Sequence, residues 1–134
     1  MKSGKTKTGK EIIPTKSELE VLQILWAKGP STVRFVHDTL NEQKEAVQYT
    51  STLKLMQVMT EKGMLERDES NMKHIYSAAL EQEKTKGFIL ERFIDSMYSG
   101  SVSSMMLALL GNDKTSKKDL QAVKEMLKKL DEKK

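Results

Sequence analysis

The stretch from Gln48 to Ala78 constrains the fold most, because a helical pattern in it runs directly into a hairpin pattern. Between Thr50 and Lys62 apolar residues recur at helical spacing, and Gly63 stops the helix. These apolar positions are Leu55, Met56 and Met59. Two short strands are expected next, over Met64 to Arg67 and Lys73 to Ala78. The turn between them is formed by Asp68, Glu69, Ser70 and Asn71.

The face of this helix opposite its apolar positions carries side chains that can hydrogen-bond to base edges and phosphates. They are Thr50, Ser51, Lys54 and Gln57. One of the two hydroxyls at the helix start is expected to be the N-cap, which is compatible with a DNA contact at the positive end of a helix. The pattern therefore predicts a DNA-reading helix beside a hairpin wing.

The residues before Gln48 complete a known order of elements. Thr15 and Glu18 form a capping-box pattern, and the helix that follows ends at Gly29-Pro30. Its inward face is made of Leu19, Val21, Leu22, Leu25 and Trp26. Ser31 and Thr32 are expected to pair briefly with the hairpin. A second amphipathic helix, ending near Asn41, is indicated by Val33, Val36 and Leu40. Helix, short strand, helix, helix, strand, strand is the order of a winged helix-turn-helix.

Beyond Leu80 the strand pattern disappears and three helical patterns follow. The first covers Glu81 to Tyr98, and the second, Ser101 to Leu110, is so apolar that burial from several sides is expected. The third starts with a second capping box, Ser116 with Asp119, and has an apolar seam. The predicted class is mainly α with a small β-hairpin: a winged helix-turn-helix followed by an α-helical dimerisation region.

About fifty residues in three helices cannot easily bury so much apolar surface alone, so a second copy of the chain is the expected partner. The alternative, that these helices fold back on the winged helix as one monomeric core, stays open. The predicted organisation is a flexible basic arm over 1–13, a winged helix over 14–80 and a dimerisation region over 81–134. The residues assigned to dimerisation are Ile89, Phe93, Met97, Met105, Met106, Leu109, Leu110, Leu120, Val123, Leu127 and Leu130.

The net charge of +4 comes entirely from the N-terminal arm. Its lysines are Lys2, Lys5, Lys7 and Lys10, while the rest of the chain holds 19 basic and 19 acidic residues. Such an arm either lies against phosphates or is a solvated tail, and the sequence favours neither. Affinity of the remaining chain for DNA must come from the placement of its charges.

Composition argues against an enzyme or a metalloprotein. There is no cysteine, and the two histidines, His37 and His74, lie on different elements, where a surface or hydrogen-bonded role is expected. The nine methionines fall at helical spacing among leucines, which indicates core packing, and no phosphate loop or nucleophile motif is present. No cofactor, no metal, no secretory signal and no membrane insertion are expected, and the predicted location is the cytoplasm.

Nearly everything from Pro14 to Leu130 resembles the penicillinase-repressor family, the BlaI/MecI/CopY group of bacterial transcriptional repressors. The likeness lies in TKSELEVLQILWAKGP, in YTSTLKLMQVMTEKGML and in the wing ending HIYSA. It implies a homodimeric winged-helix repressor that binds a double-stranded DNA operator and is released by proteolysis through a membrane sensor protease. Carried over, the DNA-binding positions are Gln48, Tyr49, Thr50, Ser51, Lys54, Gln57, Arg67 and Lys73.

The chain departs from its better-known relatives in three respects. Its expected DNA-reading helix has Leu53 and Val58 where some relatives are basic, which leaves the operator sequence open. It lacks the cysteine-rich tail of the copper-responsive branch, so copper sensing is unsupported. Ser101 to Leu110 resembles the cleavable region, although Ala108 and Leu109 do not reproduce the relatives' sequence there. Two functions remain: a repressor that recognises a dyad operator, and a helical protein-interaction module on a winged-helix scaffold without specific DNA binding.

Overall fold

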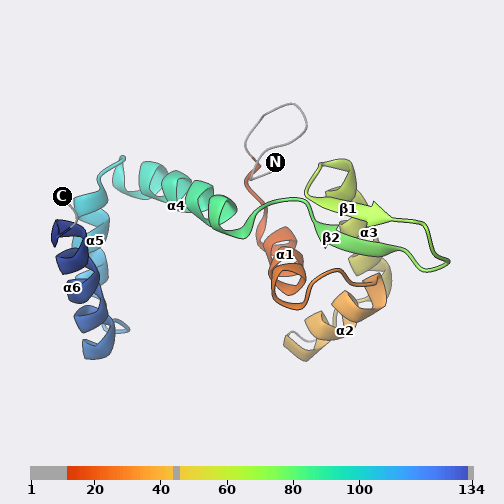
Figure 1. The fold of residues 1–134 in the computed structure, drawn as a ribbon, viewed down its shortest axis with the longest axis horizontal. Helices are drawn as coiled ribbons and strands as arrows, with labels where there is room; N and C mark the ends of the chain where they lie inside the picture. The colour runs from red at the N-terminus through yellow and green to blue at the C-terminus, as the bar shows by residue number, and fades with distance from the viewer. Residues whose placement is uncertain (1–11, 44–45, 133–134) are drawn as a thin grey trace. The chain divides into compact units, whose positions relative to one another are not determined.

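The computed structural model describes residues 12–43 and 46–132, and these form six helices and one two-stranded hairpin. The four arm lysines lie outside the described residues. The chain divides into two compact units, one ending at Ile89 and the other beginning at Leu90, so that the division falls inside a helix (Figure 1). The fold class expected from the sequence is confirmed: a winged helix-turn-helix followed by a helical region.

The first helix, α1 (Lys16–Lys28), begins and ends as its sequence predicts. The backbone N–H of Thr15 donates to Glu18 Oε1 at 2.9 Å, and the N–H of Glu18 donates to Thr15 Oγ1 at 3.3 Å. Gly29 ends the helix with φ of +84°, a left-handed conformation that glycine adopts without a steric penalty. The predicted capping box is therefore present in full.

The wing is the antiparallel pair β1 (Leu65–Asp68) and β2 (Ile75–Ala78), in which Arg67 lies opposite Tyr76. Ser31 joins the sheet as a third, one-residue strand, because its N–H and C=O both bond to the backbone of Tyr76, at 2.9 and 2.8 Å. This pairing was expected. The second strand starts two residues later than predicted, so Lys73 and His74 belong to the loop at the tip of the wing.

Two further helices, α2 (Val33–Gln43) and α3 (Tyr49–Glu61), complete the first unit. β1 packs against α3 and β2 packs against α1, which places the hairpin across the helices with its loop projecting beyond them (Figure 1). The buried core is continuous across these elements and consists of Ile12, Val21, Leu22, Ile24, Leu25, Val33, Val36, Leu40, Met56, Met59, Met64, Leu65, Tyr76 and Leu80.

Two residues expected in this core, Trp26 and Leu55, are only partly buried and pack against its edge. The indole N–H of Trp26 donates to the carbonyl of Leu80 at 2.9 Å, while part of the ring remains in contact with solvent. An indole keeps such a contact because its N–H needs a partner when it leaves water.

The second unit takes in the C-terminal part of α4 (Gln82–Tyr98), together with α5 (Val102–Leu110) and α6 (Lys117–Glu132). Ser101 caps α5 through the N–H of Ser104, and Ser116 accepts the N–H of Asp119 at 3.0 Å, which is half of the predicted second capping box. The expected burial of α5 from several sides is not found in the single chain, where neither α5 nor α6 has a buried residue. Within residues 12–43 and 46–132, no helix combines the length and the hydropathy that a membrane span requires.

Candidate nucleic-acid interface

The solvent-facing side of α3 carries the polar residues selected from the sequence. Thr52, Met56 and Met59 point into the core. The residues on the other side are exposed: Thr50, Ser51, Lys54 and Gln57. Because a helix turns by 100° per residue, these four project within about a third of its circumference, away from the buried stripe. One rigid helix therefore presents two hydroxyls, an amide and an ammonium group side by side.

The start of α3 differs from the prediction. The N-cap is Gln48, which has extended backbone angles (φ −86°, ψ 142°) and makes no side-chain cap bond. Its carbonyl accepts the N–H groups of Ser51 and Thr52 at 3.1 and 3.2 Å. The expectation that Thr50 or Ser51 is the N-cap is therefore wrong, because both lie inside the first turn. Within the described residues neither hydroxyl has an internal hydrogen-bond partner, so both remain available to an external ligand.

A polar network around the buried side chains of His37 and Thr52 fixes the first turn of α3 against α2. Asn41 Oδ1 accepts the backbone N–H of Val47 at 3.0 Å, so its Nδ2 faces His37 Nε2, also at 3.0 Å. Nε2 must then be the acceptor, which leaves the proton on Nδ1 to donate to Thr52 Oγ1 at 3.2 Å. The sequence predicted a surface or hydrogen-bonded role for His37, and the residue is buried and hydrogen-bonded. The role of Thr52 was not predicted.

The far end of α3 is held by an ion pair with α1. Lys62 Nζ lies 2.8 Å from Glu18 Oε2, and the side chain of Glu18 is only 4% exposed. Burial alone would raise the pKa of Glu18, but the hydrogen bond from Lys62 and that from the Thr15 N–H lower the pKa below its ordinary value. Glu18 therefore takes part both in the capping box of α1 and in the ion pair with Lys62, the residue that ends α3.

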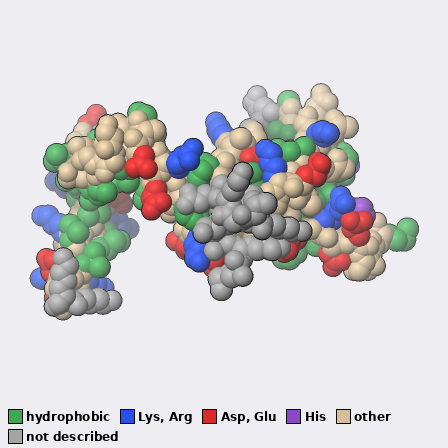
Figure 2. Space-filling view, turned by 90° about the horizontal axis from the view of Figure 1, so that it is seen from above, with side chains coloured by type: hydrophobic (Ala, Val, Ile, Leu, Met, Phe, Trp, Pro, Cys, Tyr) green, Lys and Arg blue, Asp and Glu red, His purple; other side chains and the backbone are tan. Residues whose placement is uncertain are grey.

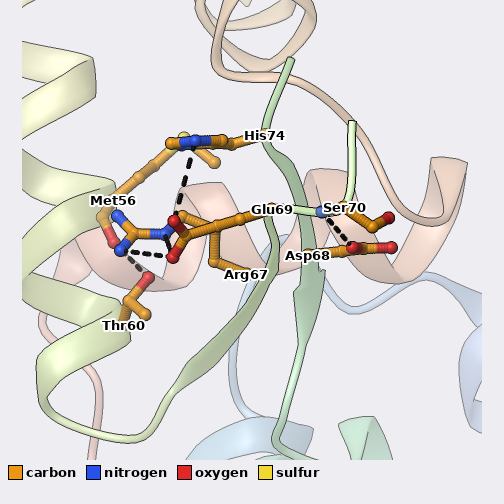
Figure 3. Close-up of polar contacts among 7 residues, drawn as sticks. All are labelled: Met56, Thr60, Arg67, Asp68, Glu69, Ser70 and His74. Atoms are coloured by element: carbon orange, nitrogen blue, oxygen red, sulfur yellow. Dashed lines mark hydrogen bonds and ion pairs between the residues drawn. The ribbon is translucent and has the colours of Figure 1, made fainter. Parts of the chain in front are cut away.

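At the wing, Arg67 is engaged by a neighbouring carboxylate. Its Nε and Nη2 both lie 2.9 Å from Glu69 Oε2, and His74 Nε2 is 3.9 Å from the other oxygen of Glu69 (Figure 3). Hydrogen bonds with Tyr76 and Glu69 raise the pKa of Arg67. The cation assigned to a DNA contact is therefore partly compensated inside the wing, whereas Lys73 is exposed in the loop.

Tyr49, a predicted DNA-binding residue, is half-buried and occupied by intramolecular contacts. The edge of its ring meets the ring of His37, with centroids 5.4 Å apart and planes at 83°. The guanidinium of Arg34 lies over its face, 4.2 Å from the ring centroid. Arg34 was not among the residues selected from the sequence. A single arginine in an amphipathic helix gives no local signal, and only its position across from Tyr49 distinguishes it.

The residues assigned to dimerisation leave much apolar surface uncovered in the single chain. Leu127 and Leu130 on α6 are 52% and 59% exposed, and Met97 on α4 is 65% exposed. Hydrophobic side chains are visible over the surface of the C-terminal helices in Figure 2. Phe93, Leu109 and Leu110 are also exposed, and the remaining members of the set are partly buried: Ile89, Met105, Met106, Leu120 and Val123.

The sequence pattern of one protein family covers most of the chain. The family described as penicillinase repressor matches residues 14–129. The chain is 20% identical to the penicillinase repressor of Staphylococcus aureus over 118 residues, which are 88% of this chain and 93% of that protein. It is 23% identical over 113 residues to the methicillin resistance regulatory protein MecI of Staphylococcus epidermidis, covering 84% of this chain and 91% of that protein.

Among solved structures, the chain is similar to a MarR family protein from Bacillus stearothermophilus. The two share 18% sequence identity with a TM-score of 0.48, over 90% of this chain and 74% of the other.

Proposed function

Because this chain belongs to the penicillinase repressor family, we propose that it is a homodimeric transcriptional repressor that recognises a dyad DNA operator through α3. It acts in the bacterial cytoplasm and needs no cofactor. The observation that carries the proposal is the exposed polar face of α3 on a helix held at both ends. A rigid helix can present base-reading groups in a fixed geometry, which sequence-specific recognition requires.

The residues on this helix and on the wing have different roles in the proposal. Ser51, Lys54 and Gln57 read base edges in the major groove, because they lie on the exposed side of α3. Arg67 and Lys73 lie on the wing and contact the sugar-phosphate backbone. Glu69 reduces the contribution of Arg67, since a paired guanidinium neutralises a phosphate less effectively.

Dimerisation holds two reading heads at the spacing of a dyad. The exposed leucines of α6 and the apolar α5 have too few partners in one chain, and a second copy would cover them. Two recognition helices on one face of B-DNA lie about 34 Å apart, and joining them makes the second contact effectively intramolecular. Leu127→Asp should place an unpaired charge in this surface and yield a monomer in sedimentation, whereas Lys128→Asp, at the exposed neighbouring position, should remain a dimer.

We extend the proposal to release from DNA. Cleavage within Ser101 to Leu110 by a membrane sensor protease would separate α6 from the reading head. Leu107, in the middle of this segment, is 71% exposed in the single chain. A cleaved chain would keep the winged helix and lose the connection between the two heads, so affinity for the dyad would fall to that of one head.

The test is a gel shift of the full chain on DNA upstream of its own gene and on random DNA. Ser51→Ala and Lys54→Ala should each weaken binding to the operator by about 1–3 kcal/mol and change binding to random DNA much less. Arg67→Ala should weaken both alike. If Ser51→Ala and Lys54→Ala lose equal affinity for both DNAs, α3 does not read bases. Absence of specific binding by the unmodified chain would favour a protein-interaction module instead.

A further inference from the structure

An open cavity of about 330 Å³ lies beside the first half of α3, between α2 and the loop of the wing. Two permanent cations line it from different elements: Arg34 comes from α2 and Lys73 from the wing loop. The imidazole ring of His74 also lines it. The other lining residues are Thr32, Val33, Tyr49, Leu53, Met72 and Tyr76, so within the described part of the chain no carboxylate faces the cavity.

Arg34 is held in position by a chain of contacts. Its guanidinium lies 4.2 Å from the centroid of the Tyr49 ring, and that ring meets His37 edge-on at 5.4 Å. His37 is itself buried and hydrogen-bonded to Thr52 of α3. A flexible exposed arginine would sample many rotamers, but stacking on the Tyr49 ring restricts the rotamers of this one, which lines the cavity.

The nearest acid to the wing side of the cavity is already engaged. Glu69 approaches His74 at 3.9 Å but is bonded to Arg67 at 2.9 Å, and Arg67 does not line the cavity. Among the described residues neither Arg34 nor Lys73 has a carboxylate partner. The cavity therefore presents uncompensated positive charge from two different elements, α2 and the wing loop, which is the chemistry that receives an anion of phosphate size.

We propose that this cavity receives one backbone phosphate of the bound DNA, with Arg34 as the residue that contacts the phosphate and Tyr49 as the residue that positions Arg34. The inference rests on the proposed function, which supplies the DNA. A guanidinium donates two parallel hydrogen bonds to phosphate oxygens, and Lys73 adds a point charge from the wing loop. Tyr49, assigned above to DNA binding by resemblance, then acts through Arg34 and not by touching DNA itself.

The experiment measures affinity of the full chain for operator and for random DNA at several salt concentrations. Arg34→Met should weaken binding to both DNAs by the same factor, because a phosphate contact carries no sequence information. Each lost contact should lower the slope of log K against log salt by about 0.9, so the advantage of the unmodified chain should shrink about threefold per subunit between 50 and 200 mM salt. Arg34→Lys should keep the slope but bind more weakly.

The role of Tyr49 is read from two variants. Tyr49→Phe keeps the aromatic face and should bind like the unmodified chain, whereas Tyr49→Leu should reproduce the loss of Arg34→Met. Combining Tyr49→Leu with Arg34→Met should add little further loss, because both changes remove one contact. Lys28→Met is the matched control: Lys28 is an exposed cation on α1 that lines a different cavity, and its removal should leave affinity and slope unchanged.

The outcomes separate this inference from the proposed function. The phosphate site is overturned if Arg34→Met leaves affinity and salt slope unchanged. If Ser51→Ala and Lys54→Ala still weaken operator binding in that case, the proposed repressor function is retained. A loss confined to the operator would also overturn the phosphate site, since Arg34 would then read bases. An unmodified chain that binds neither DNA overturns both. If Tyr49→Leu fails to fold, Arg34→Met and Arg34→Lys decide the matter, because Arg34 is exposed and outside the core.

Discussion

Lys62→Met should destabilise the winged helix, because it leaves the carboxylate of Glu18 buried without its partner. Removing one member of a fully buried pair costs about 3–5 kcal/mol. Here the lysine side chain is 50% exposed and Glu18 keeps its hydrogen bond from the Thr15 N–H, so the expected loss is smaller. A hydrogen bond to a charged group contributes about 1.5–3 kcal/mol, which places the expected loss near 2 kcal/mol.

The same variant has a defined dependence on pH. The pKa of Glu18 in the folded chain lies below its ordinary value of 4.5, so the stabilisation is present above pH 4.5 and is lost as the pH falls through the folded-state pKa. The difference in unfolding free energy between the unmodified chain and Lys62→Met should therefore be full at pH 7. It should shrink in acid, where Glu18 is protonated in both chains.

Urea unfolding followed by the fluorescence of Trp26 measures this difference. Trp26 is the one tryptophan of the chain and lies on α1, so its signal reports on the first unit. Lys54→Met is the matched control, an exposed lysine on α3 without a buried partner, and should change stability by less than about 0.5 kcal/mol. A loss for Lys62→Met as small as that of the control, or one equally large at pH 7 and pH 3, would refute the reasoning.

Three further changes test the backbone and the buried network. Gly63→Ala should cost about 1–2 kcal/mol in the same urea experiment, because Gly63 has φ of +86°, and a stability equal to that of the unmodified chain would contradict this. Gly87→Ala, inside α4 with open space around the added carbon, should instead stabilise that helix by about 1 kcal/mol in thermal melts followed by circular dichroism; destabilisation would reveal a contact that the structure lacks. Thr52→Val leaves His37 Nδ1 without an acceptor and should cost about 1–3 kcal/mol by Trp26 fluorescence, whereas no loss would mean that the two side chains are not bonded.

Local signals in the sequence predicted the elements of this fold well. The Thr15 and Glu18 pair and Gly29 mark the ends of α1 through contacts over three or four residues, which a sequence shows directly. Ser31 was expected to pair with the hairpin and does. The N-cap of α3 was misassigned because Tyr49, packed on His37, lies inside the helix and moves its start ahead of the two hydroxyls.

The contacts that position the candidate interface were harder to predict, because their partners are far apart in the sequence. Lys62 and Glu18 are separated by 44 residues. Both lie in the stretches that resemble the family, but nothing in the sequence indicates that their side chains are in contact. Arg34 and Tyr49 lie on different helices, and neither residue type indicates the other. Composition identified α5 as a strongly apolar segment, and in the single chain α5 has no buried residue.

Helix α3 is fixed at both ends within the free chain, by His37 at its first turn and by Glu18 beyond its last. A segment fixed in this way has little conformational entropy left to lose on docking. The heat-capacity change of binding should then match the apolar area buried at the contact, without the excess that accompanies coupled folding. If α3 reads DNA as proposed, no rearrangement of this helix should delay the encounter, and the association rate should depend on salt through charge steering. In the proposed dimer, occupancy of the operator would then be controlled by joining or separating the two winged helices.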